Sequence, residues 1–157
     1  MTMGTTGTTI LRRGCRRSAA TSAGRDDVAR VLLDSTVLID ALRGRPAADR
    51  VRKMRRVGDE PWVCAISVEE IWRGARSEEH LTIRRLFRGL RCAPLGVAEG
   101  EQAGRWRRDL ADSGVTVHQA DCLIAAAALA IGGRLATANP DDFPMPELIV
   151  DHWPVGR

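Results

Sequence analysis

Short apolar runs alternate with segments of helical pattern along most of this chain, and this alternation constrains the fold more than any other feature. The apolar runs are expected to be strands at 31–34, 61–66, 90–95, 134–137 and 148–150. Helices are expected at 36–43, 46–57, 67–76, 78–88, 98–112 and 120–131. Short strands of this kind, uniformly apolar, are typical of parallel sheets that are covered on both faces. The pattern predicts one α/β domain, a three-layer α/β/α sandwich with a central, mainly parallel sheet.

The first 30 residues differ in composition from the rest. They are rich in Thr, Gly, Ser and Arg and show no sustained apolar period. Their six arginines and two aspartates account for the whole net charge of +4, so residues 31–157 carry equal numbers of acidic and basic residues. We therefore expect a disordered basic leader over 1–30 and a folded domain over 31–157. The basicity of the whole chain is no argument for nucleic acid binding.

The cysteines and the hydropathy bear on the cellular compartment. The four cysteines form no CxxC pair and have no histidine at zinc-finger spacing. Cys64, Cys92 and Cys122 lie in apolar runs and are expected to be buried free thiols, which are typical of a reducing cytoplasm. No apolar run approaches the ~20 residues that a membrane helix needs. We expect a soluble, cytoplasmic protein with no membrane partner.

Four acidic residues are expected at one edge of the sheet. Asp34 ends the first strand, Glu70 lies in the first turn of the helix after the second, and Asp121 starts the apolar helix. Asp142, together with Asn139, follows the fourth strand. Ligands of open parallel sheets bind beyond the carboxyl ends of the strands. Carboxylates gathered there would raise one another's pKa values, and Mg²⁺ or Mn²⁺ would relieve the repulsion. This predicts a site for metal-assisted phosphodiester chemistry.

Each acid also has a structural explanation. Ser67-x-x-Glu70 fits a helix capping box, Asp121 could be a favourable first-turn charge, and Asp142 could serve a turn. Asp34 is the hardest to explain in this way, because an unpaired acid that borders a buried strand is costly. The occurrence of all four acids in this order, on one sheet edge, favours a shared site.

A basic segment lies close to the first acid in sequence. Its residues crowd into a stretch of 14: Arg43, Arg45, Arg50, Arg52, Lys53, Arg55 and Arg56. Such a run is usually a solvated helix face, and phosphate contact is the alternative. A neutral domain with a carboxylate pocket would need local arginines to approach a nucleic acid.

Other nucleotide and phosphate chemistries lack their signatures. A phosphoaspartate enzyme or receiver domain also begins with a strand that ends in Asp, but both need a downstream lysine, and the only lysine is Lys53. The hydrolase version also needs a second Asp where Thr36 stands. There is no GxxxxGK[ST] loop and no GxGxxG fingerprint. The runner-up is a non-catalytic RNA-binding or partner-binding module on the same fold, which would use the arginines for RNA.

Four segments of the chain resemble PIN-domain ribonucleases, and among these the VapC toxins of bacterial VapBC toxin–antitoxin modules. The resemblance runs from about residue 31 to the C-terminus and rests on Val31-Leu32-Leu33-Asp34-Ser35-Thr36, Glu70-Ile71-x-x-Gly74, Asp121-x-x-Ile124 and Thr137-x-Asn139-x-x-Asp142-Phe143. It implies a PIN-like fold and a Mg²⁺- or Mn²⁺-dependent endoribonuclease that arrests growth by cutting a structured RNA. It also implies a VapB-like antitoxin whose tail occludes the site, and a homodimer.

The resemblance also assigns roles to individual residues. Asp34 and Asp121 would be the main metal ligands, and Glu70 would support them or a second ion and help to activate water. Asn139 and Asp142 compete for the place of the fourth acid. The hydroxyl of Thr36 would line the site.

Two further acids, Glu69 and Asp40, lie close in sequence to the candidate site residues. Glu69 competes with Glu70 for the inward position, although Glu70 has the better spacing to Gly74. Asp40 is expected to be a structural acid of the first helix. We expect the antitoxin to place an arginine against Asp34 and Asp121, where it would mimic the charge of the metal.

Overall fold

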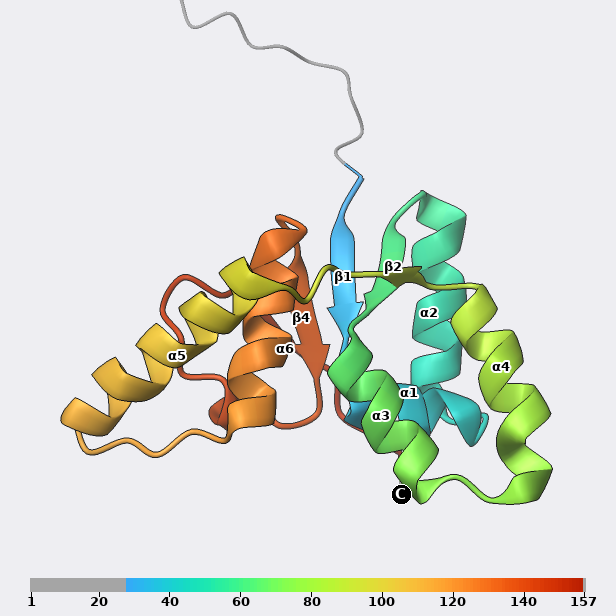
Figure 1. Ribbon diagram of the computed structural model, residues 1–157. Helices are drawn as coiled ribbons and strands as arrows, with labels where there is room; N and C mark the ends of the chain where they lie inside the picture. Colours follow the sequence, from blue (N-terminus) through green and yellow to red (C-terminus); the bar gives the residue numbers. More distant parts are fainter. Residues whose placement is uncertain (1–27, 157) are drawn as a thin grey trace, which may run out of the picture.

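The computed structural model describes residues 28–156, so the expected leader lies outside the described residues up to residue 27. Five parallel strands form one sheet in the order β3-β2-β1-β4-β5 (Figure 1). The strands are β1 Arg30–Leu33, β2 Glu60–Val63, β3 Arg91–Cys92, β4 Arg134–Thr137 and β5 Val150–His152. Every neighbouring pair is parallel, which confirms the expected parallel sheet.

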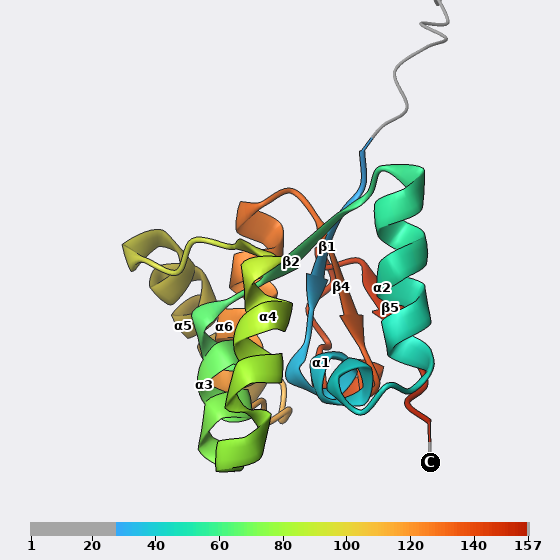
Figure 2. The ribbon, with the colours of Figure 1, turned by 90° about the vertical axis from the view of Figure 1, so that its right-hand side faces the viewer.

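Helices cover both faces of this sheet, as the three-layer prediction requires (Figure 2). The helices are α1 Ser35–Leu42, α2 Pro46–Val57, α3 Ala65–Gly74, α4 His80–Arg88, α5 Val97–Asp112 and α6 Gln119–Ala130. Short 3₁₀ helices, η1 Ser77–Glu79 and η2 Pro140–Asp142, follow α3 and β4. Helices α5 and α6 pack tightly against each other on one side, and α1 and α2 lie on the other (Figures 1 and 2).

The central strand β1 shows why its sequence is uniformly apolar. Leu32 belongs to the core cluster that it shares with α5 and α6. Val31 and Leu33 point to the opposite face and belong to the cluster formed with α1 and α2. All three side chains are buried, because successive strand residues face opposite sides and here both sides are covered.

Several element boundaries differ from the expected ones. Strand β2 ends at Val63 and α3 begins at Ala65, two residues before Ser67, so Ser67 does not cap the helix. Its side chain is fully buried, with Oγ 3.6 Å from the Sγ of Cys64. The capping-box explanation of Glu70 is therefore wrong. Helix α1 begins at Ser35, one residue earlier than expected, and its N-cap is Asp34, whose side chain accepts from the N–H of Ser35.

The expectation of three buried thiols is confirmed for two of them. Cys64 and Cys122 are fully buried, whereas Cys92 is exposed. Cys92 lies on β3, a two-residue strand at the edge of the sheet that residues 28–156 form. Within the part of the chain that the structure describes, no helix has the length and apolar character needed to cross a bilayer.

Part of the basic segment forms a solvated helix face, whereas Arg43 and Arg45 precede the helix and Arg50 is half-buried. Helix α2 runs over Pro46–Val57, as predicted, and buries Ala47, Val51 and Met54. Its charged side chains Arg52, Lys53, Arg55 and Arg56 are exposed.

Candidate active site

Asp34 lies at the carboxyl end of β1, in the middle of the sheet, and begins α1. Its side chain is 5% exposed, and every polar partner that holds it is neutral. Oδ1 accepts a hydrogen bond of 2.7 Å from the backbone N–H of Ser35. Oδ2 accepts hydrogen bonds of 2.8 Å from the hydroxyls of Thr36 and Thr137. The carboxylate is therefore fixed in direction but has no cation to neutralise it among the described residues.

The two threonines tie the end of β4 to the end of β1. The Oγ1 of Thr36 accepts a bond of 3.1 Å from the backbone N–H of Ala138, and the Oγ1 of Thr137 accepts one of 3.1 Å from Asn139. Each hydroxyl thus accepts a hydrogen bond from the loop after β4 and donates one to Asp34. The strand order turns back between β1 and β4, which is where open α/β sheets bind ligands.

Asp121 shows that the four predicted acids share one electrostatic environment. It is the third residue of α6 and has a pKa raised to about 6. Burial is the largest cause, and repulsion by Asp142, Asp34 and Glu70 adds to it, whereas the neighbouring His118 acts in the opposite direction. A carboxyl whose charge is opposed by three other carboxylates is the arrangement that a bound cation would stabilise.

Glu70 comes from α3 but not from its first turn, which corrects the expected position. Because α3 begins at Ala65, Glu70 is its sixth residue and lies in the second turn. It is half-buried and affects the pKa of Asp121, whereas Glu69 is exposed. This placement favours Glu70 over Glu69 as the inward acid.

The loop after β4 carries the last pair of candidates. Asp142 ends η2 and is exposed, and it is the strongest carboxylate neighbour of Asp121. Asn139 precedes η2 and is also exposed, and its backbone N–H binds Thr137. The electrostatic contact with Asp121 favours Asp142 as the fourth acid.

The chemistry of these donors fits a hard divalent cation. Between residues 28 and 156, no three His, Cys, Asp or Glu side chains converge as a complete metal-binding group. Mg²⁺ does not need one, because it usually keeps several waters and takes one or two carboxylates from the protein. The Oδ1 of Asp34 accepts the N–H of Ser35 at 2.7 Å and the hydroxyl of Ser35 at 3.5 Å, and a metal ion could replace the second, long contact.

Two contributors to this site escaped the sequence interpretation. Thr137 was noted only as part of a motif, and its hydroxyl is fully buried on Asp34. Its position at the end of β4, beside β1, was the available signal. His118 immediately precedes α6 and partly offsets the rise in the pKa of Asp121.

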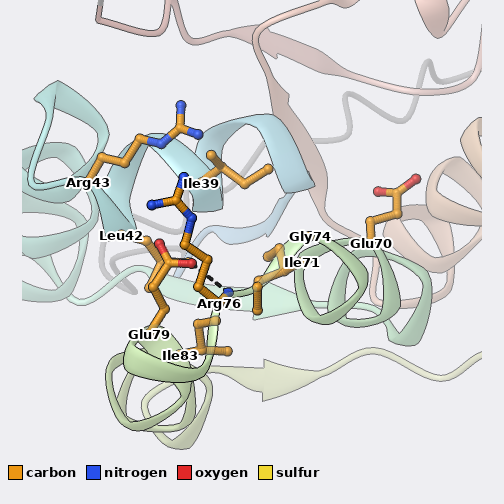
Figure 3. A pocket seen from close by; sticks show the side chains of 10 residues that line it. Ile39, Leu42, Arg43, Glu70, Ile71, Gly74, Arg76, Glu79 and Ile83 are labelled. Carbon is orange, nitrogen blue, oxygen red and sulfur yellow. Dashed lines mark hydrogen bonds between the residues drawn. The ribbon is translucent and has the colours of Figure 1, made fainter.

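A cavity of about 410 Å³ opens beside Glu70, between α1, α3 and the start of α4 (Figure 3). Its lining combines apolar side chains with charged ones: Ile39, Leu42, Arg43, Glu70, Ile71, Gly74, Ala75, Arg76, Glu79 and Ile83. In Figure 3, Glu70 lies on one side of the cavity and the arginines lie on the other. The site edge therefore continues into a partly apolar hollow.

Comparison with known proteins agrees with this architecture. Residues 31–145 match the model of the PIN domain family, and the chain belongs to this family. Ribonuclease VapC10 of Mycobacterium tuberculosis is 35% identical over 116 residues, which cover 73% of this chain and 86% of that protein. Ribonuclease VapC19 of the same species is 29% identical over 115 residues, covering 73% and 92%.

Solved structures share the fold at lower identity. A DNA-bound VapBC from Salmonella typhimurium matches with a TM-score of 0.69 and 20% identity, covering 80% of this chain and 99% of that one. VapBC2 from Rickettsia felis, bound to a promoter DNA fragment, matches with a TM-score of 0.68 and 19% identity, covering 79% and 98%. These likenesses confirm the PIN-like α/β/α sandwich.

Proposed function

We propose that this protein is an endoribonuclease, the toxin of a toxin–antitoxin pair, which cleaves cellular RNA with the help of Mg²⁺ or Mn²⁺. The observation that carries the proposal is the gathering of Asp34, Glu70 and Asp142 around Asp121 at the carboxyl edge of the sheet, where burial first and then these carboxylates raise the pKa of Asp121. Membership of the PIN domain family and the likeness to two ribonucleases support the same reaction.

The four acids divide the work according to their surroundings. Asp34 and Asp121 would hold the ion, because Asp34 is fixed by three neutral donors and Asp121 gains most from a nearby cation. Asp142 and Glu70 would complete the negative charge around the ion, and Glu70 would help to activate the attacking water. When bound, the ion supplies a water of lowered pKa and neutralises charge on the reacting phosphate.

The remaining residues of the site hold these acids in place. Thr36 and Thr137 orient the carboxylate of Asp34 through their hydroxyls. Asn139 would line the site, a role supported by its own backbone N–H bond to Thr137 and by the bond of the preceding Ala138 N–H to Thr36. The site thus needs β1 and β4 to be in register before Asp34 is oriented.

The partners follow from the same reasoning. The proposed substrate is RNA, and the proposed inhibitor is a VapB-like antitoxin that places an arginine against Asp34 and Asp121. An arginine would satisfy the acids as the ion does, through charge-assisted hydrogen bonds. A complex in which these acids remain free and solvated would contradict this contact. A homodimer and a cytoplasmic location complete the proposal.

The first test is cleavage of total cellular RNA by the purified, antitoxin-free protein. Wild type is compared with Asp34→Ala and Asp121→Ala in Mg²⁺, Mn²⁺ or EDTA. We expect discrete, metal-dependent fragments that are lost in both variants. A folded wild type without such fragments would support a non-catalytic binding module instead. Fragments that persist in the variants would show contamination or a wrong assignment of the residues.

A further inference from the structure

The cavity beside Glu70 is lined partly by apolar and partly by charged side chains. Of these residues, only Glu70 has a role in the proposed chemistry. The cavity floor is apolar and is formed by Ile39 and Leu42 of α1, Ile71 of α3 and Ile83 of α4. Its charged lining consists of Arg43, Arg76, Glu79 and Glu70. Because Glu70 lines the cavity and also contributes to the raised pKa of Asp121, the cavity adjoins the acidic edge of the sheet.

The two arginines of the cavity have unpaired guanidinium groups, as do other described arginines such as Arg56, and what distinguishes them is that both line one hollow. Within residues 28–156, neither guanidinium makes an ion pair or a hydrogen bond. Other arginines are paired with carboxylates: Arg30, Arg52, Arg91, Arg105, Arg108 and Arg134. Arg43 and Arg76 extend over the side of the cavity away from Glu70 (Figure 3).

Glu79 is the one carboxylate on the arginine side, and it is held by the backbone. Its Oε2 accepts a hydrogen bond of 2.9 Å from the backbone N–H of Arg76. The guanidinium groups of Arg43 and Arg76 therefore keep all their donors for an outside ligand. Guanidinium groups bind phosphate oxygens through two parallel hydrogen bonds.

The apolar floor suits the base or the ribose of a nucleotide whose phosphate is bound by the arginines. Proteins that recognise RNA often accept bases that have been turned out of the stack and laid against side chains. A volume of about 410 Å³ lies within the ~300–1,000 Å³ range of small-ligand pockets. The cavity has guanidinium groups that can bind phosphate on one side, an apolar floor, and a catalytic acid on the other side. This arrangement matches one nucleotide in an extended strand.

We propose that this cavity binds one nucleotide of a single-stranded RNA segment next to the bond that is cut. Arg43 and Arg76 bind its phosphate, and its base or ribose rests on Ile39 and Ile71. This assignment rests on the proposed function, whose site it extends. It makes the cavity a determinant of which RNA is cleaved, because the acids alone do not distinguish one phosphodiester from another.

Binding of a random-sequence, single-stranded RNA 20-mer in EDTA tests the site without cleavage. We expect Arg43→Ala and Arg76→Ala each to weaken binding about 5- to 10-fold, as lost charge-assisted contacts do. The double variant should flatten the slope of log K against log salt by about 0.7, the value for one phosphate of a single strand. The matched control is Arg56→Ala, an exposed and unpaired arginine of the same basic segment that lines none of the cavity.

Two further variants keep the test independent of folding. Arg43→Lys retains the charge and should recover part of the affinity. Glu79→Gln removes the opposing charge but keeps an oxygen for the Arg76 amide, so it should tighten binding about 2-fold. A gain in affinity has no explanation in damaged structure. Equal binding by the Arg43, Arg76 and Arg56 variants would overturn the assignment.

Cleavage of total RNA separates this inference from the proposed function. Cleavage that needs Asp34 but is unchanged by Arg43→Ala and Arg76→Ala would overturn the nucleotide site and leave the nuclease intact. Absence of cleavage, with binding that still depends on both arginines, would support the site and contradict the nuclease. If the two variants lose only a co-expressed protein partner and bind RNA normally, the cavity is a protein-docking site and the inference is wrong.

Discussion

Helix α1 has a buried aspartate at its start and another near its end, and the two carboxylates are held in different ways. Asp34 is 5% exposed and Asp40 is 2% exposed. Asp40 accepts backbone N–H bonds of 3.0 Å from Ala47 and from Gly156, one on each oxygen. Asp34 accepts one backbone N–H and two threonine hydroxyls, and it faces other carboxylates.

This difference separates a structural acid from a chemical one. The two amides that bind Asp40 join α2 and the C-terminal segment to α1, so its charge is used to hold three parts of the chain together. The hydroxyls that bind Asp34 orient it, and its charge adds to the repulsion that raises the pKa of Asp121. Burial alone therefore does not identify a catalytic acid. The kind of donor and the sign of the surrounding charge do.

The largest expected effect is on cleavage, and it distinguishes the two acids directly. Asp34→Asn should lower RNA cleavage by at least about 100-fold, because it removes a charge that holds the metal. Asp40→Asn, measured per folded molecule by the same assay, should cleave within about 3-fold of wild type. Equal losses in the two variants would mean that Asp34 acts only through the structure of α1.

The second prediction concerns stability, for which Asp40 is expected to matter more than Asp34. Asp40→Ala leaves the amides of Ala47 and Gly156 without partners and should lower the free energy of unfolding by about 2–4 kcal/mol. Asp34→Ala should lower it less in metal-free protein, since the same change relieves repulsion around Asp121. Urea unfolding measures both. Asp49→Ala, at an exposed acid, is the control and should change it by less than about 0.5 kcal/mol.

The contrast between the acids also shows how far sequence reasoning reaches. Helix α2 and strand β4 have the predicted bounds, because Pro46 and Gly58 mark the ends of the helix and Gly133 precedes the strand. The join of β2 and α3 was misplaced, since Cys64 and the residues after it continue an apolar run that fits strand and helix equally.

In the candidate site, too, some features could be predicted from the sequence and others could not. The positions of Asp34, Asp121 and Asp142 relative to the strands and helices followed from the ends of predicted elements, whereas Glu70 lies one turn further into its helix than expected. The hydroxyl contacts of Asp34 depend on the register between β1 and β4, where Leu33 pairs with Ala136. Register is set by packing across the whole sheet, so the contact between Thr137 and Asp34 could not be read from the local sequence.

A smaller effect is expected at the hydroxyl that orients Asp34. Thr137→Val keeps the shape of the side chain but removes the donor to Asp34 and the acceptor for Asn139. Loss of such a supporting contact typically costs 10- to 100-fold in metal affinity or activity, and we expect about 10-fold in cleavage. Thr137→Ser should recover most of it, because the hydroxyl returns. Thr82→Val, on the exposed side of α4, is the control. Unchanged cleavage and metal affinity in Thr137→Val would show that the hydroxyl has no part in orienting Asp34.

The smallest effect tests the repulsion among the carboxylates around Asp121, to which Asp34 contributes and Asp40 does not. The pKa of Asp121 is raised to about 6, by burial first and then by Asp142. Asp142→Asn removes that repulsion and should lower the pKa of Asp121 by less than one unit, as followed by carboxyl ¹³C NMR of metal-free protein. Asp141→Asn is the matched control, since Asp141 is exposed in the same turn and is not among the causes of the shift. Equal shifts in the two variants would contradict a specific contact.

The sign of the linkage gives this prediction a second measurement. Because the folded state holds the proton of Asp121 more tightly than the unfolded state, its contribution makes metal-free protein less stable as pH rises from about 4 to about 6. Asp121→Asn removes this contribution, so the variant should equal wild type near pH 4 and exceed it in Tm above pH 6. Mg²⁺ should narrow the gap above pH 6 by stabilising wild type alone. A variant less stable than metal-free wild type at pH 7 would mean that the carboxylates attract a partner within the fold and do not repel one another.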